Sequence, residues 1–351
     1  MAYSSIIKPS AFMNTKLYTG TGSSNAQTGI GFQPDWVWLK CRSSAKHNNL
    51  YDVVRGATKE IYSNLTNAED TDAQSLKSFN SDGFTVGTGA DQNENNATYV
   101  AWNWKAGTSF TNDASGTGIG SVDSTGSVNQ TSGFSIMSWT GTGANATVAH
   151  GLGATPKMMI FKVRDGATAW VVYHKNVGPT KGLFLNTAGT GSTVSAYFQD
   201  TNPTSSVFSV GSDADTNGSS KSMITYCFAE KQGYSKFGVY AGNNSSTGGF
   251  HYTGFKPAFI IIKRTDSAAD WRTYDDKRFR AGGPNNKFNY LQANGDNGEA
   301  DSDSGGAWDM LSNGFKFYTS DAAINGGGTY IYMAFAENPF VASNFNAATA
   351  R

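Results

Sequence analysis

The chain has 351 residues and no formal net charge, because 27 Lys and Arg residues balance 27 Asp and Glu residues. Only 15% of the residues are charged and the sequence holds no dense basic run, which argues against a nucleic-acid-binding surface. It also holds no stretch of about 18 apolar residues that could span a bilayer, and its first residues do not form a signal-peptide pattern. We therefore expect a soluble protein with no nucleic-acid partner and no membrane insertion.

The composition predicts an all-β fold. Gly is abundant at 41 residues, aromatic residues make up 13% of the chain, and the polar residues are mostly Ser, Thr and Asn. This mixture favours strands that are joined by tight turns. Two cysteines, Cys41 and Cys227, are too few for a disulfide framework or a thiolate metal site, so we expect reduced, buried thiols and no cofactor.

Three segments of the chain share one strand pattern. In each, a proline is followed six residues later by a lysine, and the residues between them are almost all apolar. Such a run predicts a strand that is buried on both faces. The prolines are Pro34, Pro156 and Pro257, and the lysines are Lys40, Lys162 and Lys263.

Further landmarks recur at similar distances in the three segments. They comprise a tyrosine eleven residues after the lysine, an aromatic residue 16 or 17 residues before the proline, a phenylalanine that opens a later strand, and a closing aromatic residue that we assign to Trp102, Phe228 and Phe335. The pattern predicts three tandem β-sandwich repeats of the jelly-roll or lectin-like kind, each with a hydrophobic core of its own.

The landmarks define the domain boundaries. Residues 17–106, 134–232 and 238–338 are the three predicted repeats. Residues 1–16 carry several apolar side chains and are predicted to be an N-terminal docking arm, and residues 339–351 are a C-terminal tail. Residues 107–133 are rich in Gly, Ser and Thr and predict a linker or a long surface ribbon. The second and third repeats are joined by a short connector, so we expect them to pack closely.

Several motifs of the chain resemble a repeated domain in virion proteins of tailed phages from marine and freshwater genomes. The resemblance extends from about Tyr18 to Phe340 and rests on the segments Phe32 to Trp38, Asp52 to Thr58, Ser81 to Phe84, Tyr99 to Gly107, Ser138 to Gly143, His150 to Gly153, Tyr226 to Glu230 and Tyr330 to Phe340. In one respect the second copy departs from the others: His174 follows Tyr173, whereas Asp52 and Asp275 follow the corresponding tyrosines.

The resemblance implies a phage structural protein that is made in the host cytoplasm and located in the virion. The family has no assigned catalytic residues, so it implies no enzyme activity. We expect a tail-associated fibre, adaptor or spike that provides an attachment or assembly surface, with other virion proteins as partners and a homo-oligomer, for which we expect a trimer. The alternatives are a capsid decoration or head fibre protein, and a lectin-like module that binds a host surface polysaccharide. A polysaccharide depolymerase would need paired carboxylates in a groove, for which the sequence gives no positive sign.

Two sets of residues are candidate binding residues. Asp213, Asp215 and Asn217 match the start of an EF-hand calcium loop, although Ile224 stands where that loop needs a glutamate. Trp170 and Trp271 lie three residues before the repeated tyrosine and are candidates for glycan stacking or for an interface. Their periodic recurrence favours a place in the core over either role.

Overall fold

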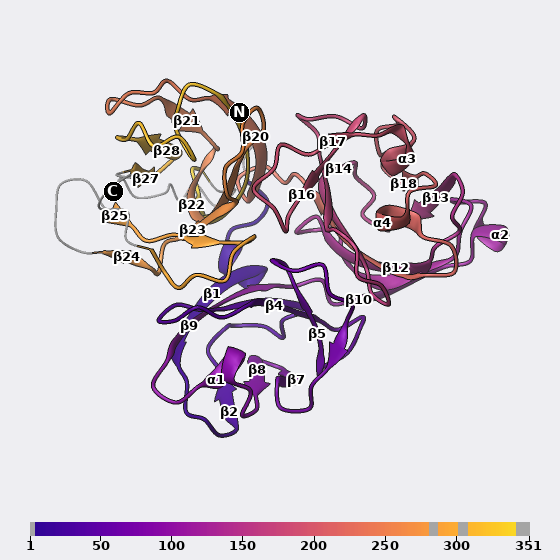
Figure 1. Ribbon diagram of the computed structural model, residues 1–351, viewed down its shortest axis with the longest axis horizontal. Helices are drawn as coiled ribbons and strands as arrows, with labels where there is room; N and C mark the ends of the chain where they lie inside the picture. Colours follow the sequence, from indigo (N-terminus) through magenta and orange to yellow (C-terminus); the bar gives the residue numbers. More distant parts are fainter. Residues whose placement is uncertain (1–3, 281–286, 301–307, 342–351) are drawn as a thin grey trace.

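The computed structural model describes residues 4–280, 287–300 and 308–341. The protein is mostly β, and every pairing between named strands is antiparallel (Figure 1). Figure 1 shows three groups of strands arranged around a common centre. We call these groups unit 1, unit 2 and unit 3, and each consists of one main sheet and a smaller sheet. Among the described residues, no helix has the length and apolar character needed to cross a membrane.

Unit 1 is built from the first third of the chain. Its main sheet has the order β1 (Met13–Thr19), β9 (Thr98–Trp104), β3 (Trp36–Cys41), β4 (Asn48–Asp52), β5 (Lys59–Tyr62) and β6 (Asp70–Thr71). Its smaller sheet has the order β2 (Asn25–Gln27), β8 (Gly83–Val86) and β7 (Leu76–Asn80). A short 3-10 helix, η1 (Pro9–Ala11), precedes β1, and the short helix α1 (Ala90–Asn93) precedes β9.

Unit 2 has the longest main sheet. The order is β10 (Thr108–Asn112), β11 (Ser124–Asn129), β12 (Phe134–Thr140), β19 (Ser222–Ala229), β14 (Pro156–Val163), β15 (Val171–His174), β16 (Lys181–Phe184) and β17 (Ser192–Thr193). The smaller sheet pairs β13 (Ala146–Ala149) with β18 (Val207–Val210). The short helices are α2 (Ala114–Thr117), α3 (Ser195–Phe198) and α4 (Ala214–Asn217).

The segment 107–133, expected as a linker or surface ribbon, forms β10, α2 and β11 and joins the main sheet of unit 2 through β12. Its low apolar content fits this position, because β10 is the edge strand and most of its residues are exposed.

Unit 3 completes the described chain. Its main sheet has the order β20 (Ser235–Ala241), β29 (Thr329–Pro339), β22 (Phe255–Arg264), β23 (Arg272–Asp275) and β26 (Leu291–Gln292). Its smaller sheet has the order β21 (Phe250–Tyr252), β28 (Gly314–Phe317) and β27 (Trp308–Leu311), and β24 (Phe279–Arg280) pairs with β25 (Lys287–Phe288). Of the predicted tail, residues 342–351 lie outside the described residues.

The strand register corrects one landmark of the sequence. Near the start of the strand that follows each recurring proline, the paired residues are Trp36 with Trp104, Met158 with Phe228, and Phe259 with Phe335. The closing aromatic of unit 1 is therefore Trp104 and not Trp102, which lies one pleat earlier on the same face. With this correction the closing residue comes twenty residues after Phe84, Phe208 and Phe315 alike.

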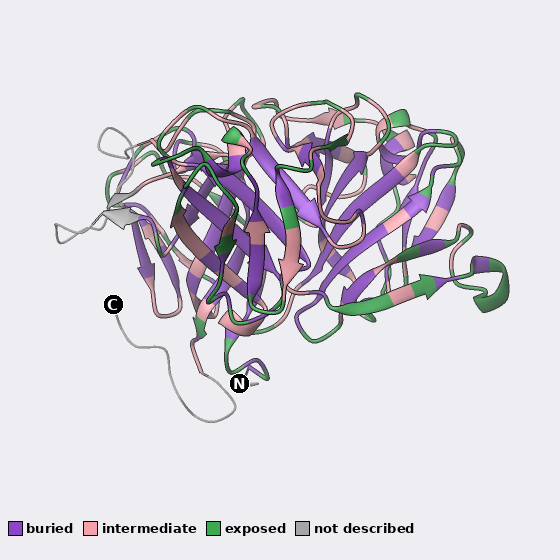
Figure 2. Ribbon diagram, turned by 90° about the horizontal axis from the view of Figure 1, so that it is seen from below, coloured by how far each residue is buried: buried purple, intermediate pink, exposed green. Residues whose placement is uncertain are grey.

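The hydrophobic core has one shared part and three local parts. The shared cluster joins buried side chains from the main sheets of all three units, including four tryptophans of unit 1 (Trp36, Trp38, Trp102 and Trp104). Each unit also has a cluster between its main and smaller sheets. In Figure 2 the strands are mostly buried and the exposed residues lie mainly in outer loops. We expected each copy to have a hydrophobic core of its own, and each unit does have a local cluster. The expectation missed the shared cluster, in which the opposite face of each main sheet packs against the neighbouring units.

The N-terminal residues pack between units 1 and 3. Ile6 is buried in the shared cluster, and the backbone N–H of Ser4 donates to the carbonyl of Val341 at 3.2 Å. The ring of Phe12 packs edge-on against Tyr234, with ring centroids 6.0 Å apart. The later part of the predicted arm, from Met13, is strand β1 of unit 1.

Candidate functional site

The junctions between the units are held by buried polar side chains that donate to the backbone of the next unit. The Trp170 indole N–H of unit 2 donates to the Tyr62 carbonyl of unit 1 at 2.8 Å, and the Trp271 indole N–H of unit 3 donates to the Phe184 carbonyl of unit 2 at 2.8 Å. Asn48 of unit 1 occupies the corresponding place, because it lies eleven residues after Val37 just as Trp170 lies eleven residues after Met159. The Asn48 side-chain amide donates to two carbonyls of unit 3. Both predicted tryptophans therefore lie at junctions, and in this structure their rings are buried.

The repeated lysines make a second set of links between the same units. All three lysines are buried, and each ammonium group donates both to a carbonyl of its own unit and to a carbonyl of a neighbouring unit. The neighbouring acceptors are Asp296 for Lys40 at 2.7 Å, Thr66 for Lys162 at 3.1 Å, and Ala188 for Lys263 at 2.7 Å. These hydrogen bonds link unit 1 to unit 3, unit 2 to unit 1, and unit 3 to unit 2, so the three units form a closed ring. Burial lowers the pKa of each of these lysines to about 8.

The junction between units 1 and 2 contains a buried charged cluster. The Asp52 carboxylate accepts from the Arg55 guanidinium at 2.5 Å and from the Tyr226 hydroxyl of unit 2 at 2.8 Å. Glu69 of unit 1 pairs with Arg164 of unit 2 at 2.9 Å. Burial lowers the pKa of Arg55, but Asp52, Tyr226 and Glu69 together outweigh burial and raise it, so the guanidinium stays charged.

The junction between units 3 and 1 repeats this cluster with different partners. Asp275 accepts from Arg278 at 2.6 Å and from the Trp102 indole N–H of unit 1 at 2.8 Å. Glu299 of unit 3 pairs with Arg42 of unit 1 at 2.7 Å and with Arg278 at 3.2 Å. Although Glu299 is largely buried, its pKa is lowered because it accepts hydrogen bonds from Arg42 and lies beside Arg278. No peptide bond links unit 3 directly to unit 1, so this cluster helps to close the ring.

The junction between units 2 and 3 has a histidine in place of the aspartate. His174 is fully buried, its Nε2 lies 3.4 Å from the Tyr332 carbonyl of unit 3, and its Nδ1 accepts from the Asn176 N–H at 3.2 Å. Burial lowers the pKa of His174 to about 3, so the ring is neutral at physiological pH. The departure noted in the sequence therefore replaces a buried ion pair with a neutral hydrogen bond.

The predicted calcium ligands form a capped turn. Asp213 accepts from the Asp215 N–H at 2.8 Å at the start of α4. The buried Asn217 amide donates to the hydroxyl of Thr142 and to the carbonyls of Ala144 and Gly211, so the side chain clamps two loops together. Among the described residues, no group of three or more His, Cys, Asp or Glu side chains is placed to hold a metal ion.

The asparagine clamp recurs in the other two units, where sequence analysis missed it. Asn93 donates to the carbonyls of Ser23 and Gly87, and Asn325 donates to the carbonyls of Ser245 and Thr319. The sequence signal is an asparagine ten or eleven residues before the closing aromatic residue of each unit.

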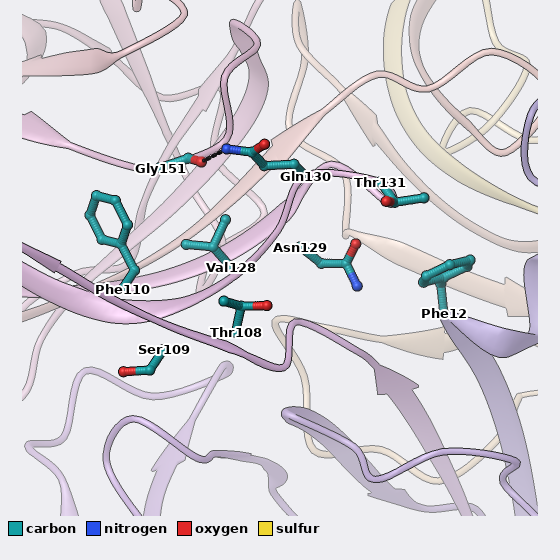
Figure 3. Close-up of a pocket in the computed structure, with 9 residues that line it drawn as sticks. All are labelled: Phe12, Thr108, Ser109, Phe110, Val128, Asn129, Gln130, Thr131 and Gly151. Atoms are coloured by element: carbon teal, nitrogen blue, oxygen red, sulfur yellow. Dashed lines mark hydrogen bonds between the residues drawn. The ribbon is translucent and has the colours of Figure 1, made fainter.

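A surface groove lies beside the edge of unit 2. Its volume is about 560 Å³ and its walls come from β10, β11, the loop at Gly151 and the N-terminal segment of the chain. Figure 3 shows Phe110 and Phe12 at opposite ends, with Thr108 and Asn129 between them. The lining residues are Phe12, Thr108, Ser109, Phe110, Val128, Asn129, Gln130, Thr131 and Gly151, and all of them are uncharged. Sequence analysis did not single out this groove, because Phe12 lies far from the other lining residues in the chain.

A protein-family model matches residues 8–339, which is nearly the whole chain. The chain belongs to the DUF7483 family. That family is described as a domain of unknown function, and the match covers all three units of this DUF7483 protein. No curated protein and no solved structure matches the chain.

Proposed function

We propose that this DUF7483 chain is a structural protein of a tailed-phage particle, in which three tandem copies of one β-sandwich module form a single rigid attachment or assembly element. The observation that carries the proposal is the closed ring of three units around a shared hydrophobic core. A tail-associated position, as a fibre, adaptor or spike, fits this form best.

The correspondence between the units supports the tandem copies. In each main sheet the last long strand lies between the strand that opens the predicted repeat and the strand after the recurring proline, namely β9 between β1 and β3, β19 between β12 and β14, and β29 between β20 and β22. The lysine link and the asparagine clamp recur in all three units at corresponding places. Independent domains joined in series would not be expected to share these details.

The energetics of the junctions support a mechanical role. Separating two units would expose apolar side chains of the shared cluster, at a cost of roughly 25 cal/mol per Å² of apolar surface. It would also leave buried charges such as Asp275 with fewer partners, which is costly in a low-dielectric interior. A ring of this kind keeps its shape under force better than modules that are joined only by linkers.

The ring also bears on stoichiometry. Three similar units in one chain can occupy a position of threefold symmetry with a single copy, whereas a trimer of chains would place nine units there. The arrangement therefore offers a monomeric alternative to the trimer expected from the sequence.

The test is to locate the chain in purified particles. Mass spectrometry of virions should detect it, and cryo-electron microscopy should show density for three units around a common centre at the tail. Density on the capsid shell would favour the alternative role in head decoration. Absence of the chain from purified particles would overturn the proposal.

A further inference from the structure

We propose that the groove between Phe110 and Phe12 binds a neutral oligosaccharide chain, such as part of a host surface polysaccharide. This inference rests on the proposed attachment function and names the ligand class and the site. The site differs from the tryptophans expected from the sequence, because Trp170 and Trp271 are buried at junctions.

The two aromatic rings are held in place before any ligand binds. Phe110 on β10 lies close over Gly151, where a Cβ atom would come within 2.8 Å of the ring. Phe12 packs against Tyr234 and is only partly buried. Rings fixed by such packing lose little conformational entropy when a sugar stacks on them, which favours binding.

The groove between the rings offers hydrogen-bonding groups that match sugar hydroxyls. Thr108 is exposed, and Figure 3 shows the Asn129 amide between Thr108 and Phe12. The Gln130 side-chain amide donates a hydrogen bond to the Gly151 carbonyl at 2.8 Å, which holds this side chain in place at the edge of the groove. Pockets that bind small ligands combine apolar walls with a few placed polar groups and have volumes of roughly 300–1,000 Å³; this groove measures about 560 Å³.

The absence of charge among the lining residues selects the ligand. A carboxylated or phosphorylated glycan would lose hydration without gaining a cationic partner in the groove. A neutral sugar presents hydroxyls for the amide and hydroxyl groups, and C–H faces for the two rings.

An extended peptide is a poorer match for the site. Strand addition uses the free backbone edge of one strand, which here is the outer edge of β10. The groove instead crosses the hairpin face, because its walls include Thr108 and Phe110 from β10 together with Val128 from β11.

The test uses the full chain, labelled with a fluorophore, on a printed array of neutral and acidic bacterial polysaccharides and oligosaccharides. The best neutral oligosaccharide is then titrated calorimetrically. Phe110→Ala is expected to weaken its binding by about tenfold or more, through loss of ring stacking. Thr108→Arg, at an exposed position, is expected to fill the groove and abolish binding. The matched control is Phe250→Ala, which removes a 44%-exposed phenylalanine from a strand of unit 3 and should leave binding unchanged. Thermal melting checks that each variant is folded.

Each other outcome overturns the inference. Failure to bind any neutral glycan on the array would do so, as would binding that survives Thr108→Arg in a folded variant. A requirement for acidic glycans, or capture of extended peptides alone, would assign the groove to another ligand class. The result is separable from the particle experiment: a chain found in virions that binds no glycan loses only this inference, and a chain absent from virions that binds one loses only the structural role.

Discussion

Replacing Asp275 with alanine should strongly destabilise the ring. Its carboxylate accepts four hydrogen bonds, from the backbone N–H groups of Lys277 and Arg278, from the Arg278 guanidinium, and from the Trp102 indole of unit 1. The side chains of Asp275 and Arg278 are both fully buried. Asp275→Ala therefore leaves one buried guanidinium short of its closest counterion and an indole N–H without its acceptor.

The expected loss in the free energy of unfolding is about 3–4 kcal/mol. Breaking a buried ion pair by removing one partner costs roughly 3–5 kcal/mol, and Arg278 keeps two weaker partners, Glu299 at 3.2 Å and the Thr273 carbonyl at 3.1 Å. An unfolding entropy of roughly 2.1 cal/mol/K per residue, applied to 351 residues, gives about 0.7 kcal/mol/K. The melting temperature should fall by about 4–6 °C if the ring unfolds as one unit.

Differential scanning calorimetry and urea unfolding can measure this loss against a matched control. Asp266→Ala removes an aspartate whose ion pair with Arg264 is 43% exposed on the aspartate side, so it should cost about 0–1 kcal/mol. The double variant Asp275→Ala/Arg278→Met removes both charges and should recover much of the loss. A single variant no less stable than the control, or a double variant no better than the single, would refute the reasoning.

Three further predictions concern the other junction residues. Burial lowers the pKa of His174 to about 3, while an unfolded histidine titrates near pH 6.5, so the native protein loses stability as pH falls from about 6.5 towards 3. The His174→Gln variant should therefore show a smaller decline of melting temperature on acidification, and an unchanged decline would contradict this. For Lys263, the pKa of about 8 lies below the unfolded value of about 10.4, so stability should rise between about pH 8 and 10, and urea titrations of Lys263→Met should show less of that rise. The Trp271→Phe variant leaves the Phe184 carbonyl without its donor and should cost about 1–3 kcal/mol by chemical denaturation. Trp36→Phe is the control, since the Trp36 indole N–H has no acceptor among the described residues, and an equal loss in both would exclude the hydrogen bond as the cause.

Local patterns predicted the strands well. A proline followed by an apolar run marks β3 and β14 and part of β22, because a strand buried on both faces needs apolar residues at every position. The register was harder to predict: Trp102 and Trp104 lie on the same face of β9, and only the pairing of Trp104 with Trp36 shows which one closes the unit.

Contacts between units could not be predicted from local patterns. Lys40 follows an apolar run, and this pattern predicts only the end of a strand. Its ammonium group nevertheless donates a hydrogen bond to the backbone carbonyl of Asp296, 256 residues away in the chain. The groove likewise combines Phe12 with Thr108 and Gly151, which come together only when units 1 and 2 and the N-terminal segment are packed. In contrast, the change from aspartate to histidine at position 174 was visible in the sequence, and only its surroundings were missing.

His174 makes the junction between units 2 and 3 different from the other two junctions of the ring. Three separate identical chains would have to use the same residue at every junction, and the assembly would look alike after each third of a turn. Here the residue at this position is the neutral His174 between units 2 and 3, whereas it is an ion-paired aspartate, Asp52 or Asp275, at the other two junctions. The three junctions are therefore chemically non-equivalent, so a rotation by one third of a turn does not superpose the ring on itself and the ring is only pseudo-symmetric.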